Sequence, residues 1–296
     1  MTKRALVLGG GGPVGIAWEA GLLAGLAGGG ADLAGANYIL GTSAGSFVGA
    51  QLAMGRKASD LTAAILAETG RPHVPRAKAE APPDLSPLME MMRQTRLGVR
   101  DPAEVRREIG AFALAANTMS EEAFIATFGR TMATASPSAW PSDAFACTAI
   151  DALTGEFVVW NAAAGVGMTQ AVASSCSVPG VFPPITIKAR RYIDGGMRSG
   201  TNADLAKGHD LTVVIALRLG GDTDLGRATQ DQLDEEIACL RDAGGRVELI
   251  TPDAACQSAF GPNLMDGSRR PAAARAGLVQ GEALAPAILA FWNAGA

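Results

Sequence analysis

Residues 36–45 read Ala-Asn-Tyr-Ile-Leu-Gly-Thr-Ser-Ala-Gly, so a short apolar run leads directly into a Gly-x-Ser-x-Gly motif. An apolar run of this length that ends in glycine is typical of a buried strand. The residues that follow are mostly small and apolar, as in a helix that packs closely on a sheet. We therefore predict a strand over 36–40, a helix over 44–54, and Ser43 in the sharp turn between them.

The start of the chain repeats this strand-to-helix pattern. Residues 4–8, Arg-Ala-Leu-Val-Leu, predict a buried strand, glycines 9–12 follow it, and residues 14–27 predict a helix. Two such units in succession are typical of βαβ folds. The sequence therefore predicts an α/β fold with a central, mostly parallel sheet wrapped by helices.

The region from about residue 70 to 140 differs in character from what precedes it. Prolines cluster at its beginning, and helices are predicted over 85–96, 102–116 and 121–129. We predict that this region is a helical insertion, or lid, within a single domain of residues 1–296.

Beyond residue 140 the sheet pattern returns. The predicted strands are 144–150, 156–160, 211–217 and 246–250, and the predicted helices are 167–174, 229–243 and 272–292. The first two strands are expected to pair across the turn at Thr154-Gly155, because Gly readily supplies the backbone conformation that such turns need.

Composition narrows the class of protein. The chain has 296 residues, 48% of them hydrophobic and 18% charged, which suits a folded domain with a sizeable core. A formal net charge of −4 argues against a nucleic-acid partner. The four cysteines are widely spaced and form no Cys-x-x-Cys pair, so we expect reduced thiols and no metal site.

The N-terminus and the apolar runs predict where the protein acts. Residues 5–8 are too few for the apolar core of a signal peptide, and no apolar stretch reaches the roughly 18 residues of a transmembrane helix. We expect a cytoplasmic protein that contacts membranes only transiently. The sequence gives no indication of the oligomeric state.

Ser43 has the setting of a catalytic nucleophile. Gly41 and Gly45 provide the small residues that a crowded strand-to-helix turn needs, and the following helix directs its free N–H groups towards the serine. A serine hydroxyl needs an adjacent base, yet the chain has only two histidines, His73 and His209. His73 lies in the proline-rich stretch and His209 lies just before a strong strand, so neither stands out as that base.

Asp194, in the run Tyr-Ile-Asp-Gly-Gly, is another candidate base. Taken alone, an Asp-Gly pair is most simply a turn. A carboxylate with the usual pKa of about 3.9 is also a poor base near neutrality, but burial near Ser43 would raise that pKa. The residues leave open both a Ser43–Asp194 pair and a Ser43–Asp194–His209 set, whose chain order is that of α/β-hydrolases.

The glycine run after the first strand permits two interpretations. Gly10, Gly11 and Gly12 are suited to an oxyanion hole, because glycine lets backbone N–H groups approach a substrate closely. Gly10, Gly12 and Gly15 also fit the dinucleotide-binding pattern Gly-x-Gly-x-x-Gly, and Asp32 lies about 20 residues further on. In that motif, however, the acidic residue ends the second strand, whereas Asp32 precedes it.

Three motifs in one order resemble the patatin-like phospholipase family. They are the glycine run at 10–15, the serine motif at 41–45 and the Asp-Gly-Gly at 194–196. The stretch 173–184 is also similar to the family's sequence before its aspartate. The resemblance covers about residues 4–220.

The resemblance implies a Ser–Asp dyad that contains no histidine. It makes Ser43 the nucleophile and Asp194 the residue that activates it, and it assigns glycines 10–12 to the oxyanion hole. It also implies hydrolysis of fatty-acyl esters without a metal or other cofactor. The family often has Arg or Lys at the position of Val14, so phospholipids, neutral lipids and small esters all stay open as substrates.

Overall fold

The computed structural model describes residues 2–68, 84–129, 132, 140–217 and 223–294. Its strands are β1 (Arg4–Leu8), β2 (Tyr38–Gly41), β3 (Phe145–Asp151), β4 (Phe157–Trp160), β5 (Ile185–Ile187), β6 (Arg190–Asp194), β7 (Leu211–Ile215) and β8 (Arg246–Ile250). Its α-helices are α1 (Gly12–Gly28), α2 (Ala44–Ala53), α3 (Ala58–Leu66), α4 (Ser86–Arg96), α5 (Pro102–Ala115), α6 (Glu121–Gly129), α7 (Met168–Ser175), α8 (Asp224–Asp242), α9 (Ala254–Phe260) and α10 (Arg270–Asn293).

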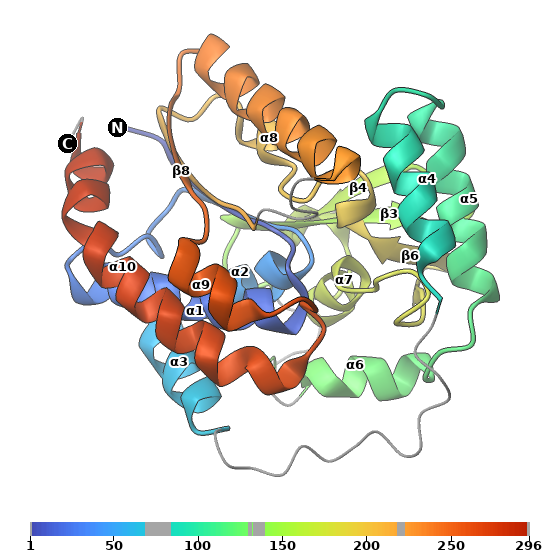
Figure 1. Cartoon of the computed structure of the whole chain (residues 1–296), viewed down its shortest axis with the longest axis horizontal. Helices are drawn as coiled ribbons and strands as arrows, with labels where there is room; N and C mark the ends of the chain where they lie inside the picture. The colour runs from blue at the N-terminus through green and yellow to red at the C-terminus, as the bar shows by residue number, and fades with distance from the viewer. Residues whose placement is uncertain (1, 69–83, 130–131, 133–139, 218–222, 295–296) are drawn as a thin grey trace.

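The described strands form one mixed sheet in the order β5-β6-β3-β2-β1-β7-β8, with β4 also paired to β3. Strands β3, β2, β1, β7 and β8 run parallel to one another. Strands β4 and β6 each pair with β3 in antiparallel orientation, and β5 pairs with β6 in the same orientation. The predicted mostly parallel sheet is therefore confirmed. The antiparallel strands are confined to one side of it (Figure 1).

Helices cover both faces of the parallel part of the sheet. Leu6 and Leu8 of β1 pack in the core that contains α1, α2, α7 and α10, whereas Ala5 and Val7 pack in the core that contains α8. Figure 1 shows α8 on one side of these strands and α1 with α10 on the other. Burial on both faces explains why these strands are almost continuously apolar rather than alternating.

Helices α1 and α10 pack backbone to backbone through glycines. A Cβ atom added at Gly21 would lie 2.1 Å from the carbonyl oxygen of Ala274, and one added at Gly25 would lie 2.2 Å from that of Leu278. Neither oxygen can retreat without moving its helix. Because α1 begins at Gly12, the last glycine of the run, this packing also fixes the position of that run.

Gly25→Ala is expected to destabilise the protein by about 1–3 kcal/mol, because the new methyl group overlaps the α10 backbone. Gly28, in the last turn of the same helix, is the matched control, since a Cβ atom there meets nothing within 4 Å. Gly28→Ala should be neutral or stabilise by up to about 1 kcal/mol, as expected for Ala over Gly in a helix. Urea unfolding measures both changes, and equal stabilities for the two variants would contradict the packing.

Helices α4, α5 and α6 occupy the described part of the predicted 70–140 insertion, and their bounds match the predicted helices closely. Helix α4 packs against α5 and α8, and α6 packs against α7. Met91 and Met92 lie against a small core, whereas Met89 is 46% exposed. The role of this region as a lid stays a prediction, and residues 69–83, with His73, lie outside the described residues. None of the described helices is both long and apolar enough to cross a membrane.

Candidate active site

Ser43 lies in a strained turn between β2 and α2, with φ at 53° and ψ at −117°. A positive φ is uncommon for a residue with a side chain and is found preferentially at functional sites. A Cβ atom at Gly41 would lie 2.4 Å from the Cα of Ser46, and one at Gly45 would lie 2.1 Å from the carbonyl oxygen of Leu8. Glycine at position 41 therefore leaves room for the first turn of α2, and glycine at position 45 lets α2 pack against β1.

Residues at the end of α7 hold the backbone of Ser43. The Ser43 N–H donates to the hydroxyl of Ser175 at 3.0 Å. The Ser43 carbonyl oxygen accepts from the Ser46 hydroxyl at 2.6 Å and from the Cys176 thiol at 3.1 Å. Burial raises the pKa of Cys176, so this thiol keeps its proton and its role as a donor. These bonds offset the strain of the turn.

Strand β3 brings Asp194 to the end of β2. Cys147 of β3 pairs with Gly41 of β2, and Ala149, two residues further along, pairs with Asp194 of β6. At both positions β4 occupies the other edge of β3. The ends of β2 and β6 therefore meet along one edge, which places Asp194 beside Ser43 although 150 positions separate them in the chain.

The carboxylate of Asp194 is buried, with a relative exposure of 2%. It accepts a hydrogen bond from the N–H of Gly196 at 2.7 Å, and it lies near enough to the Ser43 side chain for that side chain to affect its pKa. Burial raises the pKa of Asp194 to about 7, while the nearby Ser43 side chain and the Gly196 N–H oppose that rise. A carboxylate with a pKa near 7 can both hold and release a proton at neutral pH.

The glycine run passes beside Ser43. A Cβ atom at Gly10 would lie 3.4 Å from that of Ser43, and Gly12 has a φ of +57°. The Gly10 N–H donates to the carbonyl oxygen of Gly200 at 2.7 Å, so it is already engaged. In the described part of the chain, the N–H groups of Gly11 and Gly12 have no such acceptor. Of the three predicted oxyanion donors, Gly10 is therefore the one whose N–H is already bound among the described residues.

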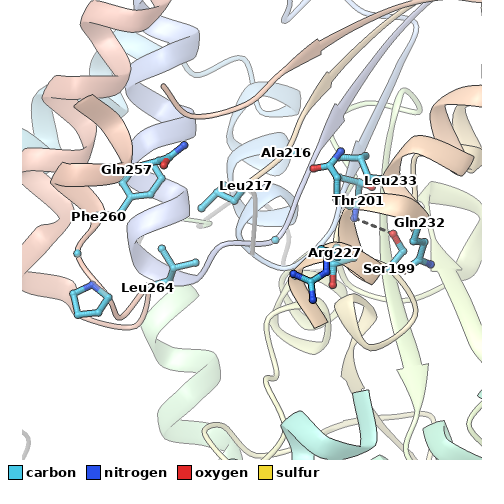
Figure 2. A pocket seen from close by; sticks show the side chains of 17 residues that line it. Ser199, Thr201, Ala216, Leu217, Arg227, Gln232, Leu233, Gln257, Phe260 and Leu264 are labelled. Atoms are coloured by element: carbon cyan, nitrogen blue, oxygen red, sulfur yellow. Dashed lines mark hydrogen bonds between the residues drawn. The ribbon is translucent and has the colours of Figure 1, made fainter. Parts of the chain in front are cut away.

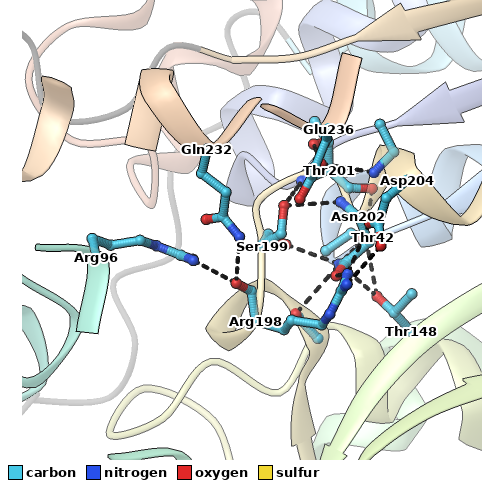
Figure 3. Close-up of polar contacts among 12 residues, drawn as sticks. Thr42, Arg96, Thr148, Arg198, Ser199, Thr201, Asn202, Asp204, Gln232 and Glu236 are labelled. Atoms are coloured by element: carbon cyan, nitrogen blue, oxygen red, sulfur yellow. Dashed lines mark hydrogen bonds and ion pairs between the residues drawn. The ribbon is translucent and has the colours of Figure 1, made fainter. Parts of the chain in front are cut away.

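A buried polar network lies beneath the serine turn (Figure 3). The Asn202 amide donates to the hydroxyl of Thr42 at 3.0 Å and to the carbonyl oxygen of Ser199 at 2.9 Å. The Thr42 and Thr148 hydroxyls are hydrogen-bonded at 3.0 Å. The network thus joins the residue before Ser43, strand β3 and the segment after Asp194. No motif in the sequence predicted it.

Helices α8 and α4 hold the segment that follows Asp194. Glu236 of α8 accepts from the Thr201 hydroxyl at 2.7 Å. Gln232 of α8 and Arg96 of α4 both donate to the carbonyl oxygen of Arg198, as Figure 3 shows. This segment carries the carbonyl group that binds Gly10, so both sides of the candidate site depend on it.

His209 lies at the opposite end of the sheet from Ser43. Its ring stacks on Tyr38, the first residue of β2, with 5.4 Å between ring centroids, whereas Ser43 follows the last residue of that strand. Its Nδ1 lies 2.7 Å from the carbonyl oxygen of Ala206. The structure therefore does not bring His209 to Ser43 and Asp194, which argues against the Ser-Asp-His alternative.

Asp32 does not occupy the position of a ribose-binding acid. It is exposed in the loop before β2, where its carboxylate accepts from the N–H of Ala34 at 3.0 Å. The end of β2, where the dinucleotide motif needs its acid, is followed by Thr42 and Ser43. The described residues also contain no group of three or more His, Cys, Asp or Glu side chains that could hold a metal ion.

Known proteins provide an independent comparison. No curated protein matches the chain. VipD from Legionella pneumophila has a similar structure at 13% identity and a TM-score of 0.45, over 97% of this chain and 67% of that one. The type III effector ExoU is similar at 16% identity and a TM-score of 0.43, over 97% of this chain and 53% of that one. The chain thus spans about two thirds of the former and half of the latter.

The family model gives the assignment. Residues 6–207 match the model described as patatin-like phospholipase, and this range is more than half of the chain. It contains the glycine run, Ser43 and Asp194. The chain therefore belongs to the patatin-like phospholipase family, a family of lipid hydrolases.

Proposed function

We propose that this protein is a carboxylic ester hydrolase that cleaves acyl esters of lipids through a Ser43–Asp194 dyad. The observation that carries the proposal is the buried Asp194 carboxylate, which lies near enough to the Ser43 side chain for that side chain to lower its pKa, at a strained strand-to-helix turn. Membership of a lipid hydrolase family supports the class of substrate. The position of this carboxylate beside Ser43 supports the identity of the nucleophile and its base.

In the first half of the reaction, Asp194 takes the proton of the Ser43 hydroxyl while the oxygen attacks the ester carbonyl carbon. The negative charge that develops on the carbonyl oxygen is bound by the free N–H groups of Gly11 and Gly12, at the N-terminus of α1. The bond from the carbonyl carbon to the alcohol oxygen then breaks. Asp194 returns its proton to the departing alcohol, and the acyl group stays on Ser43.

In the second half, water replaces the alcohol. Asp194 takes a proton from the water, whose oxygen attacks the acyl-Ser43 carbonyl carbon. The bond to Ser43 breaks, Asp194 returns the proton to its oxygen, and a fatty acid is released. None of these steps needs a metal ion or an organic cofactor.

The glycine run of this chain carries no cation. Val14 is fully buried in α1, so the position where the family often has a basic residue contributes only packing. The proposal therefore covers phospholipase A, lysophospholipase and esterase reactions alike, with transient membrane contact where the substrate lies in a bilayer.

The bond that is cleaved distinguishes the proposed acyl ester hydrolase from lipid hydrolases that release a phosphorylated head group. With a phospholipid or an acylglycerol, the expected products are a free fatty acid and the deacylated alcohol, because Ser43 attacks the acyl carbon. Mass spectrometry of the products checks this expectation. Release of a phosphorylated head group with both acyl chains retained on the glycerol would contradict it.

The pH dependence of kcat/KM is expected to report Asp194. Only the ionised carboxylate can take the Ser43 proton, and its pKa is about 7. Below that value kcat/KM should fall about tenfold per pH unit, and above it the rate should level off. A profile with 4-nitrophenyl acetate from pH 5.5 to 8.5 measures this limb. A rate that stays constant down to pH 5.5 would exclude Asp194 as the base.

A further inference from the structure

The Ser43 turn and Asp194 are held together through other segments of the chain. Strands β2 and β6 both pair with β3, and among the described residues no backbone hydrogen bond joins residues 41–46 directly to residues 193–197. The end of α7 is one bridge, because Ser175 accepts from the Ser43 N–H and the Ser177 carbonyl oxygen accepts from the Asp194 N–H. A single bridge leaves the two side chains free to swing relative to each other, so a second one matters.

Asn202 forms a second bridge between the neighbours of the two residues. Its amide nitrogen donates to the hydroxyl of Thr42, which precedes Ser43, at 3.0 Å. The same nitrogen lies 3.4 Å from the carbonyl oxygen of Gly195, which follows Asp194. Asn202 is fully buried, and a hydrogen bond shielded from water is costly to lose.

Thr148 of β3 lies between the same two neighbours. Its hydroxyl oxygen is 3.0 Å from that of Thr42, and a Cβ atom at Gly195 would lie only 2.2 Å from it. The backbone at Gly195 is thus packed directly on this hydroxyl and has no room to move towards β3. The amide and the two hydroxyls therefore fix the end of β6 relative to the end of β2.

Hydrogen bonds also set the position of the segment that carries Asn202. Its residues Ser199, Gly200 and Thr201 border a cavity of about 710 Å³ (Figure 2), so where they face that cavity they are not packed against protein. The Ser199 hydroxyl accepts from the N–H groups of Thr201 at 3.2 Å and of Asn202 at 3.0 Å, and Figure 2 shows the first of these bonds. Asn202 itself has a φ of 52°, a conformation that Asn adopts more readily than most residues.

We propose that Asn202 is a positioning residue, whose amide keeps the Ser43 hydroxyl in line with the Asp194 carboxylate. This inference rests on the proposed function, because it takes these two residues as nucleophile and base. Asn202 acts through Thr42 and not on the substrate. Because a displacement of about 1 Å can lower a catalysed rate about 100-fold, loss of the amide donor should lower kcat about 10- to 100-fold and change KM by less than about threefold.

Asn202→Asp removes the donor and keeps the rest of the side chain. The carboxylate has nearly the shape of the amide and can still accept from the Arg198 guanidinium, as the Asn202 oxygen does at 2.8 Å, but it cannot donate to Thr42. Asn161→Asp is the matched control. Asn161 is exposed, and its side-chain oxygen accepts from the Ala163 N–H at 3.0 Å. A carboxylate retains that role, so kcat should stay within about twofold of the wild-type value.

The second test changes the other end of the same bond. Thr42→Val keeps the shape of the side chain and removes the hydroxyl, so kcat for 4-nitrophenyl acetate should fall at least about tenfold. Thr42→Ser keeps the hydroxyl and should restore kcat to within about threefold of wild type. Combining Thr42→Val with Asn202→Asp should cost little more than the worse single change, because both break one bond.

All rates are expressed per active site, counted by saturating labelling with a fluorophosphonate, so that unfolded protein does not contribute. Misfolding of one variant, detected by circular dichroism, leaves the other decisive. If folded Asn202→Asp or folded Thr42→Val keeps a third or more of the wild-type kcat per site, the inference is wrong. A label on a residue other than Ser43, or full activity in Asp194→Asn, would contradict the proposed function instead.

Discussion

Ser43→Ala is expected to lower kcat for ester hydrolysis by about 10⁴-fold or more, the loss seen when a hydrolase loses its nucleophile. Without the hydroxyl no acyl-enzyme forms, and only direct attack by water on the bound ester remains. The fold should persist, because the bonds that hold the turn come from the backbone of Ser43 and not from its hydroxyl. Circular dichroism and a continuous ester assay measure the two properties.

Ser258→Ala is the matched control for this substitution. Ser258 is an exposed serine on α9, so the same chemical change there should leave kcat within about twofold of the wild-type value. If Ser43→Ala folds normally and retains a tenth or more of the wild-type kcat, another residue is the nucleophile.

Asp194→Asn is expected to lower kcat by about 10³-fold, within the range for loss of a general base. The amide has nearly the shape of the carboxylate and can still accept the Gly196 N–H, but it cannot take the Ser43 proton. The acid limb of the pH profile near pH 7 should also disappear, which a merely structural defect would not cause. Steady-state kinetics between pH 5.5 and 8.5 measure both effects.

The same variant should unfold at a higher temperature than the wild type at pH 8. Folding raises the pKa of Asp194 from an ordinary value near 4 to about 7. The wild-type protein therefore loses stability as the pH rises through this interval, because folding must bury a charge that the unfolded chain exposes. The amide carries no charge, so the variant does not lose this stability.

His209→Ala separates the dyad from a histidine-dependent mechanism. His209 stacks on Tyr38 at the far end of β2, so its removal should leave kcat within about twofold of wild type. A loss comparable with that of Asp194→Asn would restore the Ser-Asp-His alternative, and this outcome would require a different position for the His209 ring.

Local sequence patterns were sufficient to predict the parts of the fold that lie around Ser43. The strands at 4–8 and 36–40 are continuous apolar runs that end in glycine, and each is followed by a helix, so composition over a few residues identifies them. The role of Gly41 and Gly45 could also be predicted from a few residues, because a strand-to-helix turn around serine needs small neighbours.

Elements without a continuous apolar run or a helical repeat were not predicted. Strand β6 reads Arg-Arg-Tyr-Ile-Asp, β5 has three residues and α9 has seven. Asp194 was therefore visible only as part of an Asp-Gly-Gly turn. Its proximity to Ser43 arises because β2 and β6 both pair with the same edge of β3. No local sequence pattern encodes this long-range arrangement.

Contacts between distant segments account for what else the sequence could not predict. Asn202 resembles an ordinary loop residue until the fold places its amide beneath Thr42. The N–H of Gly10 is engaged only because the segment after Asp194 returns to it and presents the carbonyl group of Gly200.

Covalent labelling of Ser43 tests the central claim most directly. The protein is treated with a fluorophosphonate, which phosphonylates activated serines, and is then digested and analysed by tandem mass spectrometry. We predict close to one label per chain, located on Ser43, with loss of ester hydrolysis in proportion to labelling and no label on folded Ser43→Ala. Hydrolysis that persists in fully labelled protein, or a stoichiometric label on another residue, would contradict the account.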